Sequence, residues 1–298
     1  MSKRFLKSAT YSVHHLFKQA TDLSFKTRYD YEKNLKKFME QLHETGSAIS
    51  NIHHLKPKHV QHLIQRWQQD KLSPATIKNR LSMIRYVSHK IHKPQLISTS
   101  NQALAIPNRA YASTQNKAIE SIDLTKIKDT HIKYSLTLQQ LFGLRREESI
   151  KFIPSFADHG DYIQLKSTWT KGGIERIIPL TTPEQRQFLN ELKTAIPKGQ
   201  SLIPKDKTYI QQENTYVAQT RQAGFKNPHG LRHAYAQTLY RHLTNTLTHG
   251  HGWNCPKKGG PSRTSMDINQ QQIDHKVRLI IANHLGHSRV NITKIYCG

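Results

Sequence analysis

The sequence predicts a protein that is mainly α with a small β-sheet, built from two domains. Apolar residues recur at helical spacing through the first third of the chain and again after residue 180. Between these regions, stretches 161–166 and 174–180 alternate or are rich in β-branched residues, and a glycine pair separates them. That pattern is typical of a β-hairpin. With 36% hydrophobic residues, the chain can bury a substantial core.

The first domain is expected to be a small helical bundle over residues 21–92. Helices are predicted at about 25–42 and 57–69, because their apolar and aromatic residues share one face. A third helix begins at Ser73 and Pro74, since serine is a favoured N-cap and proline fits the first helical turn.

Two segments flank this bundle. Residues 1–20 carry Lys3, Arg4, Lys7 and Lys18 with few helix signals, and we expect a basic N-terminal arm. Residues 93–115 scatter proline, serine and asparagine among few apolar residues, which indicates a linker.

The second domain is expected over residues 116–298, with a helix at about 131–143 before the hairpin. Further helices are predicted at about 183–194, 209–223, 230–243, 271–284 and 288–296. Residues 244–268 are rich in glycine, threonine, serine, asparagine and proline, so they are expected to form a long loop or insertion.

The charge balance points to a polyanionic partner. The chain has 45 Lys and Arg against 20 Asp and Glu, a formal net charge of +25. Nucleic acid is the usual partner of so basic a protein. Lys78, Arg80 and Arg85 on the third helix are candidate DNA contacts. Neither a membrane-spanning run nor a signal-peptide pattern is found, so no membrane partner is expected and a soluble, intracellular protein fits best.

The two cysteines, Cys255 and Cys297, are too few for a disulfide framework. A metal site is conceivable at His249, His251 and Cys255, but 19 histidines make such a cluster easy to find by chance. The favoured interpretation is a polar, glycine-rich loop without metal.

The second half contains the residue types that metal-free DNA cleavage requires. Arginine forks can stabilise the charge that builds on a phosphate in the transition state. A lysine or histidine can protonate the leaving 5′-oxygen, and an attacking side chain stores the break as a phosphoester. In order, the candidates are Arg145 in Gly-Leu-Arg, Lys171 at the hairpin tip, His229 and Arg232 on one helical turn, His287 in Leu-Gly-His, and Tyr296.

This ordered set resembles the tyrosine recombinases, the family of phage integrases and Xer-type recombinases, and is similar to a proteobacterial prophage subgroup. The resemblance implies a helical core-binding (SAM-like) domain followed by a mixed α/β catalytic domain. The segment between Arg232 and Leu285 is longer than is usual in the family. Such a protein would recombine DNA for a prophage or another mobile element through a 3′-phosphotyrosine intermediate.

The resemblance also implies roles. Arg145 and Arg232 would clamp the scissile phosphate, Lys171 would protonate the leaving oxygen, and Tyr296 would attack. His229 and His287 would bind the phosphate and assist proton movement, while Glu148 would support the arginines or serve as a solvated surface residue. No cofactor is expected. The implied partners are double-stranded DNA with specific sites, a homotetramer on that DNA, and accessory DNA-bending or directionality proteins, in a bacterial cytoplasm near the nucleoid.

Two alternatives stay open from the sequence. A type IB topoisomerase resembles the same constellation, and a DNA-binding protein could keep the fold without catalysis. A second His-x-x-Arg, formed by His275 and Arg278, is interpreted as part of a surface helix.

Overall fold

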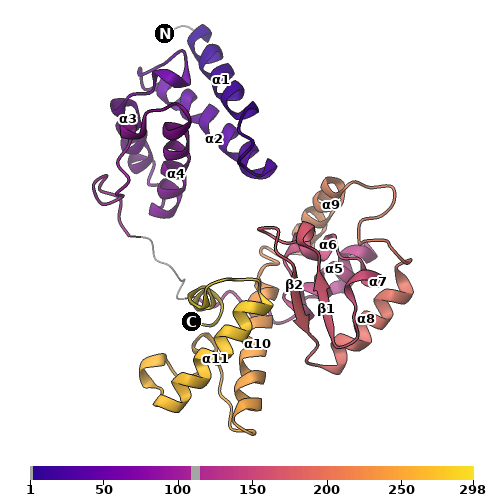
Figure 1. The fold of residues 1–298 in the computed structure, drawn as a ribbon. Helices are drawn as coiled ribbons and strands as arrows, with labels where there is room; N and C mark the ends of the chain where they lie inside the picture. The colour runs from indigo at the N-terminus through magenta and orange to yellow at the C-terminus, as the bar shows by residue number, and fades with distance from the viewer. Residues whose placement is uncertain (1–2, 109–114) are drawn as a thin grey trace. The chain divides into compact units, whose positions relative to one another are not determined.

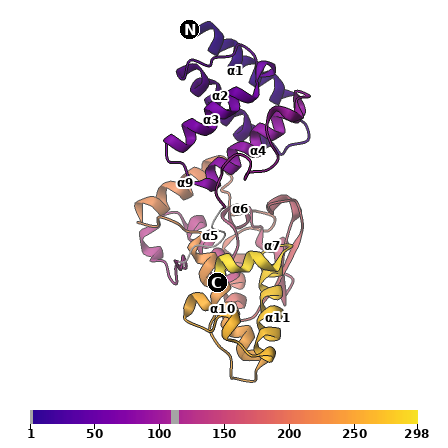
Figure 2. The same cartoon turned by 90° about the vertical axis from the view of Figure 1, so that its left-hand side faces the viewer.

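The computed structural model describes residues 3–108 and 115–298. The chain divides into two compact units, residues 1–110 and 111–298 (Figures 1 and 2). Among the described residues, no helix has the length and apolar character needed to cross a membrane.

The first unit is a helical bundle. Its helices are α1 (Lys3–Lys18), α2 (Phe25–Glu44), α3 (Pro57–Gln69) and α4 (Pro74–Lys90), with short 3-10 turns η1 (Ile52–His54) and η2 (Pro94–Leu96). The three predicted helices are confirmed. The Ser73 hydroxyl accepts a hydrogen bond from the Thr76 amide at 3.2 Å, which is the expected N-cap. Phe38 and Trp67 pack ring against ring, with centroids 5.0 Å apart in the core.

The structure corrects the expectation of a basic arm over residues 1–20. Residues 3–18 form α1, which packs along α2 (Figure 1). Ala9, Val13 and Phe17 are fully buried at a spacing of four residues, which is one face of a helix. The basic side chains therefore lie on a helix of the bundle, whose apolar face is needed for the core.

The structure also differs from the expected linker over residues 93–115. Leu96, Ile97 and Ile106 are buried in the core of the first unit, so residues 93–108 belong to that unit. The rest of the predicted linker includes residues 109–114, which lie outside the described residues.

The second unit combines helices with a two-stranded antiparallel sheet. Before the sheet come η3 (Leu124–Lys126), α5 (Thr130–Phe142), α6 (Arg146–Ile150) and α7 (Pro154–Ala157). The strands are β1 (Tyr162–Leu165) and β2 (Arg176–Pro179), with Ile163 opposite Ile178. After the sheet come α8 (Pro183–Ala195), α9 (Tyr209–Gln222), α10 (Gly230–Leu247), α11 (Ile268–His284), η7 (Val290–Thr293) and α12 (Lys294–Cys297).

The predicted hairpin strands are confirmed, but their connection is longer than a tight turn. It contains the 3-10 turn η4 (Ser167–Trp169) and then Lys171. Gly172 and Gly173 follow with φ of 96° and 69°, a backbone region that favours glycine. Trp169 is buried against Phe152 and Phe156, which anchors the loop before its exposed tip.

The expected insertion over 244–268 is shorter. Helix α10 continues to Leu247 and α11 begins at Ile268, so residues 248–267 connect them through 3-10 turns η5 (Pro256–Lys258) and η6 (Arg263–Ser265). The two helices lie side by side (Figures 1 and 2). The predicted helix at 288–296 is instead η7 followed by the short α12.

The interpretation of Arg278 as a surface residue is wrong. Its side chain is buried on α11, where Nε donates to the buried Asp274 carboxylate at 2.8 and 2.9 Å. Tyr240 of α10 donates to the same carboxylate at 2.6 Å. This cluster holds α10 against α11, whereas His275 next to it is exposed.

Candidate active site

The first predicted arginine lies where α5 ends and α6 begins. Gly143 takes a left-handed conformation, φ 62°, that ends α5. A Cβ atom there would approach the Tyr235 ring to 2.4 Å, so both conformation and space favour glycine. Arg145 is the N-cap of α6, and its amide donates to Glu148 Oε2 at 2.7 Å. This turn fixes the start of the arginine side chain.

Glu148 is a fully buried carboxylate shared by two arginines. Arg145 Nη1 donates to Oε1 at 2.7 Å, and Arg176 of β2 donates from Nη2 to Oε2 at 2.6 Å. Burial would raise the pKa of Glu148, but Arg176 and Arg145 overcome this effect and bring the pKa to about 2. Glu148 is therefore ionised and orients both guanidiniums. The sequence left two roles open for Glu148, support of the arginines or a solvated surface position, and its burial beside Arg145 and Arg176 excludes the surface position.

The second predicted arginine approaches the first. Arg232, in the first turn of α10, is 1% exposed and donates to the carbonyls of Gly143 and Leu285. Arg145 Nη2 donates to the same Leu285 carbonyl at 3.1 Å. One backbone oxygen thus joins the two guanidiniums. Burial and the charge of Arg145 lower the pKa of Arg232 to about 10, so it remains charged at neutral pH.

Tyr296 of α12 points its hydroxyl at this pair. The phenol oxygen lies 3.5 Å from Arg232 Nε and 3.3 Å from His287 Nε2. The ring is buried, and its centroid is 6.3 Å from that of His229. The structure therefore brings together five of the six predicted residues in one place: Arg145, His229, Arg232, His287 and Tyr296.

Lys171 stands at the edge of this cluster. Its side chain is exposed and lines a cavity of about 310 Å³ together with Arg145, Arg176 and His287. The loop after Trp169 thus carries the lysine to the mouth of the site, and the hairpin strand supplies the buried Arg176.

The histidine His287 is held in its neutral form. It follows Gly286, whose φ of 63° turns the chain after α11. Burial, followed by the charges of Arg232 and Arg145, lowers the pKa of His287 to about 4. Its imidazole is therefore neutral at pH 7, and one of its ring nitrogens can accept a hydrogen bond.

Two site residues were not predicted from the sequence. Arg176 occupies an inward position of β2, in alternation with the buried Ile178, and this alternation was the available signal. His233 is buried one turn after His229, and its ring centroid lies 4.7 Å from that of Tyr296. Its spacing from His229 was the only signal.

The predicted DNA contacts in the first unit have mixed environments. Arg80 lies over the rings of Trp67 and Phe38, with Cζ 5.1 and 5.7 Å from their centroids. Arg85 Nη2 donates to the Ser98 carbonyl at 2.9 Å and to Asn101 at 3.0 Å. Both guanidiniums thus have contacts within the unit, and Lys78 is partly exposed on the same helix.

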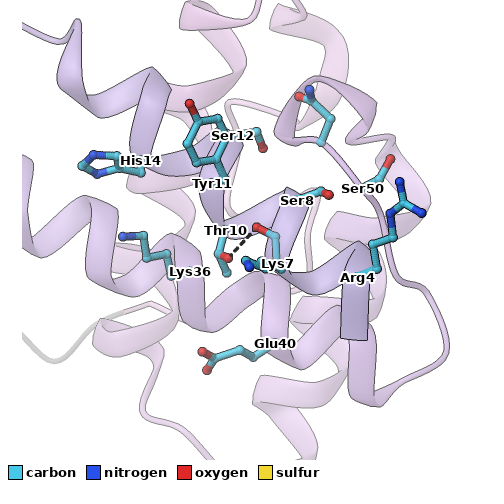
Figure 3. A pocket seen from close by; sticks show the side chains of 11 residues that line it. Arg4, Lys7, Ser8, Thr10, Tyr11, Ser12, His14, Lys36, Glu40 and Ser50 are labelled. Atoms are coloured by element: carbon cyan, nitrogen blue, oxygen red, sulfur yellow. Dashed lines mark hydrogen bonds between the residues drawn. The ribbon is translucent and has the colours of Figure 1, made fainter. Parts of the chain in front are cut away.

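A separate hollow of about 990 Å³ lies on the first unit, and polar side chains line it (Figure 3). Lys7 and His14 come from α1, Lys36 and Glu40 from α2, and Ser50 from the following turn. Its lining mixes basic, acidic and neutral polar side chains, whereas the smaller cavity of the second unit contains the site residues Arg145 and His287.

Cys255, one of the three residues considered as metal ligands from the sequence, is buried beside Cys297 in the core around α12. The described part of the chain holds no group of three side chains suited to a metal ion.

Two family models match consecutive parts of the chain. The model described as "Phage integrase, N-terminal" covers residues 7–97, and the model described as "Integrase" covers residues 98–238. Together they cover residues 7–238, which is most of the first unit, part of the second unit and four of the six predicted site residues. No curated protein matches the sequence.

Solved structures share the fold at low sequence identity. A lambda integrase (75–356) dimer bound to a COC′ core site has a TM-score of 0.57 and 13% identity, over 97% of this chain and 94% of that chain. The Tn1549 transposon integrase with circular intermediate DNA has a TM-score of 0.55 and 12% identity, over 96% and 95%. A lambda integrase tetramer on a Holliday junction has a TM-score of 0.54 and 15% identity, over 86% and 78%. The chain belongs to the phage integrase family of tyrosine recombinases.

Proposed function

We propose that this recombinase cuts and rejoins specific DNA sites with Tyr296 as its nucleophile, and that it serves as the integrase of a prophage or other mobile element. The observation that supports this most is the convergence of two arginines and a phenol. Arg145 and Arg232 share the Leu285 carbonyl, and the Tyr296 hydroxyl lies 3.5 Å from Arg232.

The arginines are suited to a phosphodiester. A guanidinium has five donors, and Arg232 uses only part of this set on the carbonyls of Gly143 and Leu285. The remaining donors of Arg145 and Arg232 bind the non-bridging oxygens and stabilise the added charge of the five-coordinate transition state. Glu148 orients Arg145 by accepting the hydrogen bond from its Nη1 at 2.7 Å.

The proposed step is a balanced exchange of one ester for another. The Tyr296 oxygen forms a bond to phosphorus as the bond to the 5′-oxygen breaks, and the DNA 3′-phosphate becomes attached to the protein. Neutral His287 accepts the phenol proton across the 3.3 Å contact, and His229 binds the phosphate. Lys171, at the cavity mouth, donates a proton to the leaving 5′-oxygen. Reversal of these transfers reseals the strand without ATP.

The assembly belongs to the same proposal. Four protomers act on two DNA sites, with accessory DNA-bending or directionality proteins, in a bacterial cytoplasm near the nucleoid. The first unit contributes DNA contacts through Lys78, Arg80 and Arg85. The lambda integrase tetramer on a Holliday junction is a structural relative that supports this arrangement.

The test is a trapped cleavage reaction. Nicked duplexes that tile the DNA flanking the gene are incubated with the protein, so that a short fragment diffuses away after cleavage and prevents resealing. We expect a covalent protein–DNA adduct with the wild type and none with Tyr296→Phe. Tyr11→Phe is the matched control, because Tyr11 is 69% exposed on α1. An adduct that persists in Tyr296→Phe would place the nucleophile elsewhere.

A further inference from the structure

The helix that carries Tyr296 is too short to hold itself in place. Helix α12 spans only Lys294–Cys297, and a single turn gains too few hydrogen bonds to offset its ordering. The carbonyls of a last helical turn also lack intrahelical donors, so other groups must supply them. The position of the phenol therefore depends on what α12 contacts.

The Tyr296 carbonyl receives its donor from α10. Gln237 is 1% exposed, and its Nε2 donates to the Tyr296 carbonyl at 2.8 Å. Gln237 lies on the same helix as Arg232, so this bond ties the backbone of the tyrosine to the helix of the phosphate-binding arginine.

Asn116 completes a connection between three segments. It exchanges two amide hydrogen bonds with Gln237: Gln237 Nε2 donates to Asn116 Oδ1 at 2.8 Å, and Asn116 Nδ2 lies 3.2 Å from Gln237 Oε1. Asn116 Nδ2 also lies 3.2 Å from the carbonyl of Lys257, in the 3-10 turn η5. Asn116 itself is exposed, near the start of the second unit's described residues.

The same turn supports the other side of α12. A Cβ added to Gly298 would lie 2.9 Å from Pro256 Cβ and 3.2 Å from Lys257 Cγ, so the backbone packs closely there. Cys297 is buried beside Cys255, which immediately precedes η5. Residues 255–258 therefore form a seat for α12, and Asn116 links this seat to Gln237.

We infer that Gln237 and Asn116 are positioning residues that align Tyr296 with the arginine pair, through the Tyr296 carbonyl and the η5 seat. This inference rests on the proposed function of Tyr296. It assigns a task to the segment between α10 and α11, which supports the nucleophile within its own chain.

The experiment measures adduct formation in a single turnover with protein in excess, together with DNA affinity and thermal unfolding. The variants are Gln237→Met, which keeps side-chain length without the donor, Asn116→Ala, and the two combined. Thr238→Ala is the matched control, because Thr238 is the next residue on α10 and is exposed. Tyr296→Phe is included to test the proposed function itself.

We expect Gln237→Met to slow adduct formation on the order of tenfold or more, since small displacements of a nucleophile are costly. Asn116→Ala should slow it severalfold, and the combined variant should be no slower than Gln237→Met, because both act through one connection. DNA affinity and the cleavage rate of Thr238→Ala should stay at wild-type values. If Gln237→Met unfolds, Asn116→Ala decides alone, since its exposed side chain can be removed without opening the core.

The inference is overturned if Asn116→Ala or a folded Gln237→Met cleaves at the wild-type rate. It is also overturned if the rate reduction in the combined variant equals the product of the two single reductions. It is also overturned if affinity falls as much as the rate. An adduct with Tyr296→Phe would instead contradict the proposed function. Loss of that adduct, with wild-type rates in the other variants, would contradict the positioning role alone.

Discussion

Replacing Glu148 with glutamine changes one proton-binding group while it keeps the side chain's shape. The carboxylate is 0% exposed and binds Arg145 and Arg176 at 2.7 and 2.6 Å. Its pKa falls from 4.5 to about 2 in the folded protein. A difference of roughly 2.5 pKa units corresponds to about 3 kcal/mol at neutral pH. The loss of a partner from a buried ion pair has a cost of this order.

The sign follows from proton binding. Because the folded pKa is depressed, the stabilisation is complete above pH 4.5 and is lost as pH falls toward 2. Glu148→Gln should therefore lower the free energy of unfolding by about 3 kcal/mol at pH 7, and the deficit should shrink to about 1 kcal/mol near pH 3. For a unit of this size, the neutral-pH loss corresponds to a melting temperature lower by about 6–12 °C.

The assay is urea or thermal unfolding of the second unit's transition between pH 7 and pH 3. Glu147→Gln is the matched control, because Glu147 is 51% exposed and pairs with Lys151 on the surface at 2.5 Å. That change should cost under about 0.5 kcal/mol. Equal stability of wild type and Glu148→Gln at pH 7, or a deficit that does not shrink in acid, would refute the reasoning.

Three further predictions concern the proton donor, acid stability and DNA binding. Lys171→Ala should cleave an unmodified strand on the order of 100-fold more slowly than the wild type. Its cleavage rate should recover on DNA in which sulfur replaces the bridging 5′-oxygen, because a thiolate leaves without a proton. A rate that stays low on this DNA would show that Lys171 is not the proton donor. His284 is buried, and burial lowers its pKa to about 4. Because the folded protein disfavours the protonated imidazole, this residue leaves the free energy of unfolding unchanged above about pH 6.5 and reduces it as pH falls toward 4. His284→Gln should therefore flatten the acid side of the unfolding curve, and an unchanged slope would contradict this. DNA affinity should fall steeply with salt in a chain of net charge +25, whereas a flat response would argue against phosphate contacts.

Local signals explain which elements were predictable. The helices that begin at Pro57 and Pro74 follow from periodicity, and the second has a serine cap that the structure contains. The spacing of Ala9, Val13 and Phe17 carried the same kind of signal for α1, but the basic residues around them favoured an arm. The short α6 and α7 have too few residues for a periodic pattern.

The contacts that hold the site residues in place could not be predicted from the sequence. The order of motifs identified the residues that meet around Tyr296, but it did not reveal which groups hold them. Arg176 is buried against Glu148, which lies 28 residues earlier in the chain and meets it only in the folded structure. Arg278 pairs with Asp274 on its own helix, and the sequence did not reveal that this pair is buried. Asn116 and Gln237 lie far apart along the chain, and their pairing follows only from the tertiary structure.

The most direct measurement of the central claim is the mass of the DNA-linked peptide. Trypsin cuts after Lys294, so the trapped adduct should carry its nucleotide remnant on the peptide that begins at Ile295 and contains Tyr296. Fragmentation that places the remnant on Tyr296 is the predicted result. A remnant on any other peptide would contradict the account that Tyr296 attacks the phosphate held by Arg145 and Arg232.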